Sequence, residues 1–256
     1  KWRFALLSCT IISFWRSWRS VWYGLVAGQL TPNRIGEPVG RLALIDSEVR
    51  GKAGFIAIWC SFTQQIATIA FGLLGILWWT NIRGFEVLPT GLPLWLVYFT
   101  ILGWIGLMLF GIVRAHWIAQ WFERFDLVKR VLHGEKLMLD FNLSTFLIVQ
   151  LISLLRYVVF STQFVILLVV FGVDASITDL YAVVALTHLF SSFIPSFSAS
   201  EVGIKAGFAI WFAGMITENA LGVTAASLFL WMLNLAIPSL IGAWFPWRGE
   251  EVKGER

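Results

Sequence analysis

The sequence predicts an all-α fold: a polytopic bundle of transmembrane helices with two re-entrant (broken) helical hairpins in an inverted-repeat arrangement. Three observations lead to this prediction. Hydrophobic residues make up 58% of the 256 residues and charged residues only 13%, and the mean hydropathy is +0.79. Several apolar stretches exceed the roughly 18 residues that a helix needs to cross about 30 Å of hydrocarbon. Two further apolar stretches are interrupted by proline and charged residues, in patterns that resemble each other.

This composition excludes several classes of protein. A soluble domain of this length does not need so much apolar side chain. Cys9 and Cys60 form no CxxC or Cys/His cluster, so we expect neither a disulfide framework nor a metal or other cofactor. The net charge is +4, but the basic residues lie mostly between apolar stretches, which indicates membrane orientation and not nucleic-acid binding. Because the chain begins with Lys1, we expect further residues to precede it.

We expect one transmembrane domain over residues 1–247, followed by a polar tail at 248–256. Its elements in chain order are a re-entrant element at 16–48, spans at 53–79 and 94–113, an amphipathic segment at 114–140, a span at 143–171, a re-entrant element at 178–217 and a span at 220–244. The amphipathic segment places aromatic and aliphatic residues at helical spacing among basic ones, which predicts a helix on the membrane surface.

The positions of lysine and arginine predict the orientation. Arg50 and Lys52, the 114–140 segment and the tail carry an excess of Lys and Arg, and all lie on one side if each span crosses once. That side is cytoplasmic by the positive-inside rule. We therefore expect a multi-pass protein of the cytoplasmic (inner) membrane, with the C-terminus and the 114–140 segment in the cytoplasm. This arrangement requires that the two interrupted stretches do not cross the membrane.

The two interruptions look like copies of one element. Each contains a proline, a short linker, a glutamate five or six residues later and a basic residue four positions after the glutamate: Pro32, Glu37 and Arg41, then Pro195, Glu201 and Lys205. A charge near the centre of a lipid-facing helix costs about 2.5–3.5 kcal/mol, so straight spans are unfavourable here. A hairpin that turns back at mid-membrane needs only about ten residues each way. In the predicted orientation the two hairpins enter from opposite sides, as in inverted-repeat transporters.

The side chains expected where the breaks meet suit an anionic, phosphate-bearing headgroup. The candidate binding residues are charged: Arg34, Glu37, Arg41, Arg156, Glu201 and Lys205. Each glutamate lies near the start of a returning helix, where a carboxylate caps free amides that could otherwise bind phosphate. Arg156 interrupts the 143–171 span and should face the bundle interior. Four further residues are expected to be structural at the helix breaks: Pro32, Gly36, Pro195 and Gly203.

Simpler structural interpretations of these residues stay open. The prolines and glycines could kink ordinary spanning helices. Each glutamate and the basic residue four positions later could form a structural ion pair. Arg34 could be a loop residue that reaches headgroups, and Arg156 could pair with a backbone carbonyl or a glutamate. His188 has no second metal ligand nearby in sequence and is typical of a packed side chain.

Residues 30–41, of the form TP-x-R-x-GE-x-x-x-R, and 195–205, of the form P-x(5)-E-x-G-x-K, resemble the two signature segments of the lysylphosphatidylglycerol synthase transmembrane region, or flippase-like (UPF0104) family. The resemblance extends over nearly the whole chain. It implies two re-entrant elements meeting inside a helical bundle, and a role in moving or handling lipids. Many relatives have a glycine-rich PGGLG-like second segment, from which residues 195–199 differ. No counterpart of the synthase's aminoacyl-transfer domain follows residue 247, so aminoacylation is not expected.

The expected function is therefore a lipid flippase or lipid-handling transporter, and not an enzyme. Its ligand would be a phospholipid or a polyprenyl-phosphate-linked lipid, and its protein partners a second copy or a synthase. The alternative is a membrane-embedded enzyme, or a non-catalytic subunit, in polyprenyl-phosphate glycolipid or aminoacyl-phospholipid synthesis. Glu37 and Glu201 would then be the acid/base pair, but the sequence contains no nucleotide-binding motif or Ser/His/Asp set to accompany them.

Overall fold

The computed structural model describes residues 1–31, 34–83, 143–194 and 198–244, together with six isolated residues between 95 and 106. Over these residues the regular structure is entirely helical, which confirms the all-α prediction. Three helices are long and apolar enough to cross a membrane: Arg50–Ile82, Ser144–Val170 and Ala220–Trp244. They coincide with three of the predicted spans. The predicted 94–113 span, apart from the isolated residues, and the 114–140 and 248–256 segments lie outside the described residues.

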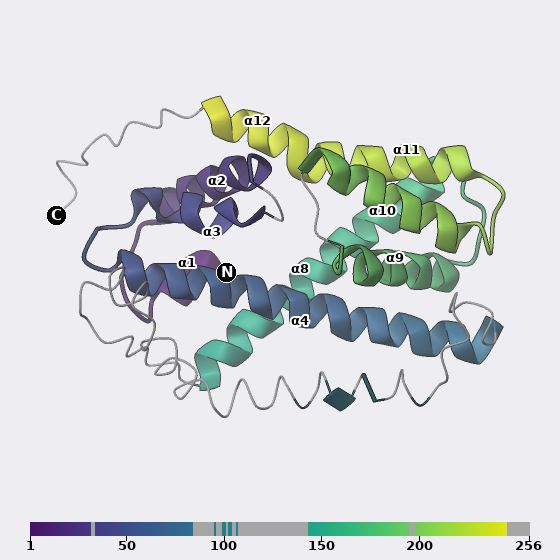
Figure 1. Cartoon of the computed structure of the whole chain (residues 1–256), viewed down its shortest axis with the longest axis horizontal. Coiled ribbons are helices and arrows are strands. Elements are labelled where there is room, and N and C mark those ends of the chain that lie inside the picture. The colour runs from purple at the N-terminus through teal and green to yellow at the C-terminus, as the bar shows by residue number, and fades with distance from the viewer. Residues whose placement is uncertain are drawn as a thin grey trace.

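The long helices form the sides of an elongated bundle (Figure 1). Helix α4 (Arg50–Arg83) runs along one side, and α11 (Ala220–Trp231) and α12 (Ile237–Trp244) run along the other. A π-helical turn, Met232–Ala236, joins α11 to α12. Helix α8 (Leu143–Val170) crosses the bundle obliquely. Its 28 residues extend about 42 Å, so a tilted helix of this length is sufficient to cross a bilayer.

Two helical hairpins lie within this bundle. Helices α2 (Phe14–Gln29) and α3 (Gly36–Arg41) form the first, and α9 (Ile177–Ser191) and α10 (Ser198–Ala213) form the second. The first packs against α12 and the second against α11. In Figure 1 the two hairpins lie end to end, so that the end of α2 and the start of α3 face the end of α9 and the start of α10 near the middle of the molecule.

The returning arm of the first hairpin is short. The sequence predicts about ten residues each way, and α2 has 16 residues, but α3 has only 6 before a three-residue 3₁₀ turn at Leu42–Leu44. The arms of the second hairpin have 15 and 16 residues. Pro38 lies in the first turn of α3, where no hydrogen bond within the helix is lost. The two hairpins therefore share a plan but differ in length.

Glycines bring the two arms of the first hairpin into backbone contact. A Cβ atom added at Gly36 would lie 2.4 Å from the carbonyl oxygen of Ala27, and one added at Gly40 would lie 2.4 Å from that of Tyr23. No side chain fits at such distances, so only glycine allows α2 and α3 to approach this closely. This contact is the small-xxx-small packing of membrane helices, made here within one hairpin.

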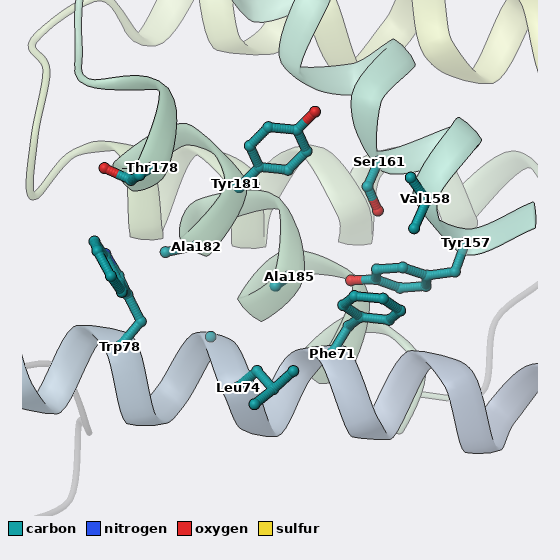
Figure 2. A pocket seen from close by; sticks show the side chains of 11 residues that line it. Phe71, Leu74, Trp78, Tyr157, Val158, Ser161, Thr178, Tyr181, Ala182 and Ala185 are labelled. Atoms are coloured by element: carbon teal, nitrogen blue, oxygen red, sulfur yellow. The ribbon is translucent and has the colours of Figure 1, made fainter. Parts of the chain in front are cut away.

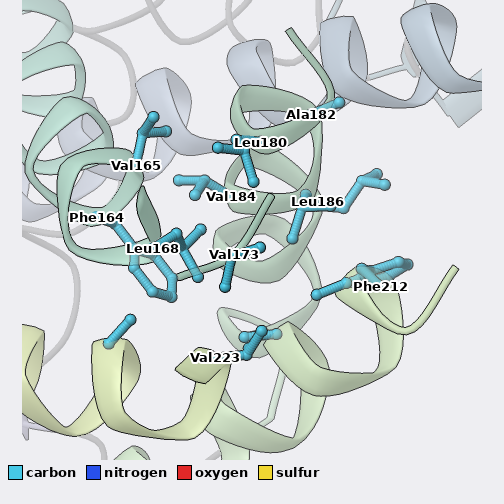
Figure 3. Close-up of a cluster of buried hydrophobic side chains, with 14 of the residues drawn as sticks. Phe164, Val165, Leu168, Val173, Leu180, Ala182, Val184, Leu186, Phe212 and Val223 are labelled. Atoms are coloured by element: carbon cyan, nitrogen blue, oxygen red, sulfur yellow. The ribbon is translucent and has the colours of Figure 1, made fainter. Parts of the chain in front are cut away.

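The main apolar core surrounds the second hairpin (Figure 3). Helix α9 is apolar on all sides and has eight buried residues, as expected for a helix enclosed by others. Figure 3 shows it among side chains of α8, α10 and α11, including Phe164, Phe212 and Val223, which are each about 1% exposed or less. A smaller cluster packs α1 (Trp2–Leu6) against the first half of α4. The second hairpin is therefore held by its core, and the first by its glycines.

We predict that Gly40→Ala destabilises the protein and that Gly207→Ala does not. The new Cβ at position 40 would overlap the Tyr23 carbonyl, and overpacking of this kind costs about 1–3 kcal/mol. No described atom lies within 4 Å of a Cβ at position 207, so this helical glycine is the matched control. Thermal unfolding in detergent should show a lower midpoint for the first variant alone. Equal midpoints for Gly40→Ala and the unmodified protein would contradict the close helix contact.

Candidate functional site

The turn of the first hairpin is fixed by a threonine and a strained arginine. The Thr31 hydroxyl accepts a hydrogen bond from the Gly36 amide at 2.7 Å and donates one to the Ala27 carbonyl at 3.1 Å, so it connects both arms. Arg34 has φ of +56°, in the left-handed region that non-glycine residues seldom adopt. Pro32 lies outside the described residues. A non-glycine residue in this conformation costs of the order of 1–3 kcal/mol, which the contacts of the turn must offset.

Glu37, in the first turn of α3, lies between two arginines. Its Oε2 atom is 3.0 Å from Nη2 of Arg34, and its Oε1 atom accepts a hydrogen bond from Nη2 of Arg41. The Glu37 side chain is only 16% exposed and that of Arg41 only 9%. Of the interpretations left open by the sequence, the ion pair between Glu37 and Arg41 is therefore formed, and Arg34 joins it.

Arg41 is also tied to its surroundings. The Ser20 hydroxyl donates a hydrogen bond of 2.5 Å to the Arg41 carbonyl, and the Trp2 indole nitrogen donates one of 3.0 Å to the same hydroxyl. The Arg41 guanidinium lies 5.8 Å from the centre of the Trp2 ring. These contacts connect α1, α2 and α3, so Arg41 has a structural role whatever else it does.

The second hairpin repeats the ion pair in a simpler form. Lys205 Nζ lies 2.6 Å from Glu201 Oε1, and Glu201 lies in the first turn of α10, as Glu37 does in α3. Pro195 lies outside the described residues. Gly203, expected to be structural at the break, is an exposed residue inside α10 with no described atom within 4 Å of an added Cβ. It therefore differs from Gly36, which packs against the partner helix.

Arg156 is the exception among the predicted residues. It lies at the midpoint of α8 and is exposed, although neighbouring protein atoms desolvate its guanidinium. Among the described residues its contact is a cation–π interaction with Phe160 at 5.1 Å, with no ion pair or hydrogen bond. Neither the carbonyl nor the direct glutamate pairing left open by the sequence is seen in this part of the chain.

The predicted charges gather from three separate elements. Arg156 interacts electrostatically with Glu37, Arg41 and Arg34 of the first hairpin. Glu201 of the second hairpin interacts electrostatically with Arg34 and Glu37. We refer to six residues as the charged cluster: Arg34, Glu37, Arg41, Arg156, Glu201 and Lys205. Four of them are cations and two are carboxylates, so the cluster has an excess of positive charge and attracts anions.

His188 is a packed side chain that interacts electrostatically with Lys205 of the charged cluster. Its ring packs edge-on against Tyr157 at 5.8 Å between centroids and lies 6.1 Å from Phe164. This packing is what the sequence indicates for a histidine on an apolar helix. Sequence reasoning did not find the close contact of α2 and α3, although its signal, two Gly-x-x-x-Gly spacings at 24–28 and 36–40, is present. It also did not find the 2.9 Å hydrogen bond from Asn234 to Gln163, for which neither residue gives a local signal.

Comparison with known proteins identifies no relative. The chain matches no protein-family model, and no curated protein or solved structure shows detectable similarity to it.

We predict that Glu37→Gln destabilises the protein far more than Asp46→Asn. The first change leaves Arg34 and Arg41 without their carboxylate in a largely buried site, and breaking such a pair costs about 3–5 kcal/mol. Asp46 pairs with Arg16 at 2.6 Å, but its side chain is 63% exposed, and exposed pairs contribute about 1 kcal/mol or less. Thermal unfolding of the two variants tests this. Similar losses from both would mean that Glu37 does not hold the first hairpin together.

Proposed function

We propose that the chain is an integral membrane lipid flippase or lipid-handling transporter, which binds an anionic, phosphate-bearing headgroup between two re-entrant hairpins. Arg156 is the observation that carries this proposal. It is a cation at the midpoint of an apolar helix of membrane-spanning length, it is accessible, and no described carboxylate or carbonyl binds its guanidinium.

Each of the other residues of the charged cluster forms an ion pair within it, and Arg156 does not. Arg34 and Arg41 bind Glu37, and Lys205 binds Glu201. An arginine near the bilayer centre costs about 2.5–3.5 kcal/mol or more, so such residues are typical of ligand or ion pathways. A guanidinium forms two parallel hydrogen bonds to a phosphate, which makes phosphate a better match than a neutral headgroup.

The hairpin arrangement supports a re-entrant, inverted-repeat organisation. The turn ends of the two hairpins face each other near the middle of the bundle, and each returning helix has a glutamate in its first turn. In a bilayer, polar backbone of this kind is stable only inside protein or beside water. We infer that the hairpins enter from opposite sides, with the Arg50 end of α4 in the cytoplasm, and that the charged cluster lines a hollow at mid-depth.

The resemblance to the flippase-like family supports a lipid as the transported molecule. The two segments that carry the resemblance, 30–41 and 195–205, are the segments that bring Glu37 and Glu201 toward each other. If the cargo were a small soluble anion, its cavity would not need to be flanked by helices that face lipid. We therefore assign the cargo as a phosphate-bearing membrane lipid.

We predict that Arg156→Gln strongly reduces transport without destabilising the protein. Loss of a charge-assisted contact to phosphate lowers affinity by about 10- to 100-fold. Because the guanidinium binds no described carboxylate, its removal also relieves a desolvation cost, so the unfolding midpoint should stay the same or rise. The measurement is translocation of a fluorescent anionic phospholipid in proteoliposomes, followed by quenching from outside.

The matched control is Arg16→Gln, since Arg16 is half exposed and pairs with Asp46 away from the charged cluster. It should leave translocation unchanged. If a folded Arg156→Gln protein translocated lipid at the wild-type rate, the proposal would be contradicted. An equal loss of translocation in the Arg156→Gln and Arg16→Gln variants would contradict it as well.

A further inference from the structure

A fifth cation, which is not among the residues singled out in the sequence, lies beside the charged cluster. Lys1 precedes α1, and its Nζ atom donates a hydrogen bond of 2.6 Å to the carbonyl oxygen of Cys60 in α4. Cys60 is about 15 Å along α4 from Arg50, so the ammonium group lies deep beside a helix of membrane-spanning length. In Figure 1 the N-terminus correspondingly lies near the middle of the molecule.

The residue after Lys1 anchors this end of the chain to the first hairpin. Trp2 is buried, its indole nitrogen binds the Ser20 hydroxyl of α2, and its ring lies under the Arg41 guanidinium of α3. The Lys1 ammonium is therefore held next to the charges of that hairpin. It interacts electrostatically with Arg156, Arg41 and Glu37.

A chain of hydrogen bonds also connects Lys1 to α8. The Cys60 carbonyl that accepts from Lys1 accepts a second hydrogen bond, of 2.9 Å, from the Thr63 hydroxyl. The Ser153 hydroxyl of α8 is 3.3 Å from that of Thr63, and both residues are buried. Arg156 follows Ser153 by three residues, which is about one helical turn. Lys1 therefore lies within about two helical turns of Arg156 along the bundle.

Neither Lys1 nor Arg156 is neutralised by a carboxylate in the described part of the chain. Lys1 binds a neutral carbonyl, and Arg156 lies over the ring of Phe160. The carboxylates of Glu37 and Glu201 bind other cations. With Lys1 included, five cations face two carboxylates, which leaves an excess of three positive charges in a site with little water. A ligand with a single negative charge would neutralise only one of them.

A neighbouring face of α8 offers an anion no charged group. Tyr157 leaves the helix about 100° away from Arg156 and stacks on Phe71 of α4, with 4.5 Å between ring centres. Figure 2 shows this stack at one end of an apolar cavity of about 290 Å³ between α4, α8 and α9. None of the described residues that line the cavity is charged. A phosphate group therefore belongs on the Arg156 face of the helix, which Lys1 approaches.

We propose that Lys1 and Arg156 together bind a phosphomonoester group, so that the site prefers a dianionic phosphate to a phosphodiester. This inference rests on the proposed function and deepens it. A phosphomonoester carries a charge of about −1.5 to −2 at pH 7 and has three terminal oxygens. The guanidinium takes two of these oxygens in parallel hydrogen bonds, and the ammonium takes the third. A phosphodiester has only two such oxygens and a single charge. Phosphatidic acid, polyprenyl phosphates and inorganic phosphate share the preferred group.

The preference is tested by competition for binding of radiolabelled dioleoyl phosphatidic acid to the purified full chain in detergent, near neutral pH. Unlabelled phosphatidic acid should compete about tenfold better than dioleoyl phosphatidylglycerol, which has the same chains and a phosphodiester. This factor corresponds to one hydrogen bond to a charged group. Equal competition by the two lipids would overturn the inference.

The role of Lys1 is tested by Lys1→Gln in the same assay. Competition by phosphatidic acid should fall about tenfold and competition by phosphatidylglycerol should stay unchanged. A glutamine amide can still donate to the Cys60 carbonyl, so a purely structural role of Lys1 would leave the preference intact. Lys1→Arg, which keeps the charge, should retain the preference.

The matched control is Arg3→Gln. Arg3 is an exposed cation of the same helix, and it likewise donates a hydrogen bond to a backbone carbonyl, that of Ile12 at 3.2 Å. Arg3→Gln should keep the preference for phosphatidic acid. An unchanged preference in Lys1→Gln, or an equal loss in Arg3→Gln, would overturn the assignment of Lys1.

Two further competitors identify the source of the phosphomonoester. Competition by undecaprenyl phosphate, with none by inorganic phosphate at the same concentration, supports a lipid ligand. Competition by inorganic phosphate as strong as that by phosphatidic acid would support the dianion site and contradict the lipid transporter. A retained preference in a protein that translocates no lipid would likewise contradict the proposed function alone, because binding does not require transport.

Discussion

The carboxylate of Glu37 is the interaction on which the first hairpin and the charged cluster depend, because one buried negative charge holds two arginines at once. Arg34 lies on the turn, in a strained backbone conformation, and Arg41 lies one helical turn further along α3. Without this carboxylate two cations would repel each other in a site with little water. With it, the turn is fixed in position. Arg156 of α8 then lies near charged residues that are already paired with one another.

The packing of the backbone and the placement of charge support each other. Close approach of α2 and α3 through Gly36 and Gly40 brings the first turn of α3 to the end of α2, which places Glu37 beside Arg34. The second hairpin reaches a similar arrangement through a large apolar core around α9, with one pair, Glu201 and Lys205, at its turn. With Arg156, the charged cluster has four cations and two carboxylates, so it has an excess of positive charge.

Much of the fold was predictable because it follows from local patterns. Apolar length predicts the spans 53–79, 143–171 and 220–244, which coincide within a few residues with described helices, and proline followed by charge predicts the two breaks. The pairing of Glu37 with Arg41 follows from their spacing of four. The short returning arm of the first hairpin and the open surface at Gly203 were not predictable, because both depend on which helix packs against which face. The observation that no described carboxylate binds Arg156 is likewise a three-dimensional property, since it depends on where the carboxylates of other helices lie.

The central claim is that the two hairpins enter the membrane from opposite sides. It is tested most directly by labelling single cysteines in sealed vesicles of known orientation with a membrane-impermeant maleimide. In a protein lacking the native cysteines, Ser13→Cys and Asp46→Cys mark the ends of the first hairpin, and Asp174→Cys and Glu218→Cys mark those of the second; all four positions are exposed. The account predicts that the first two label only from the cytoplasmic side and the last two only from the outer side. Labelling of the two ends of either hairpin from opposite sides would show an ordinary spanning segment and contradict it.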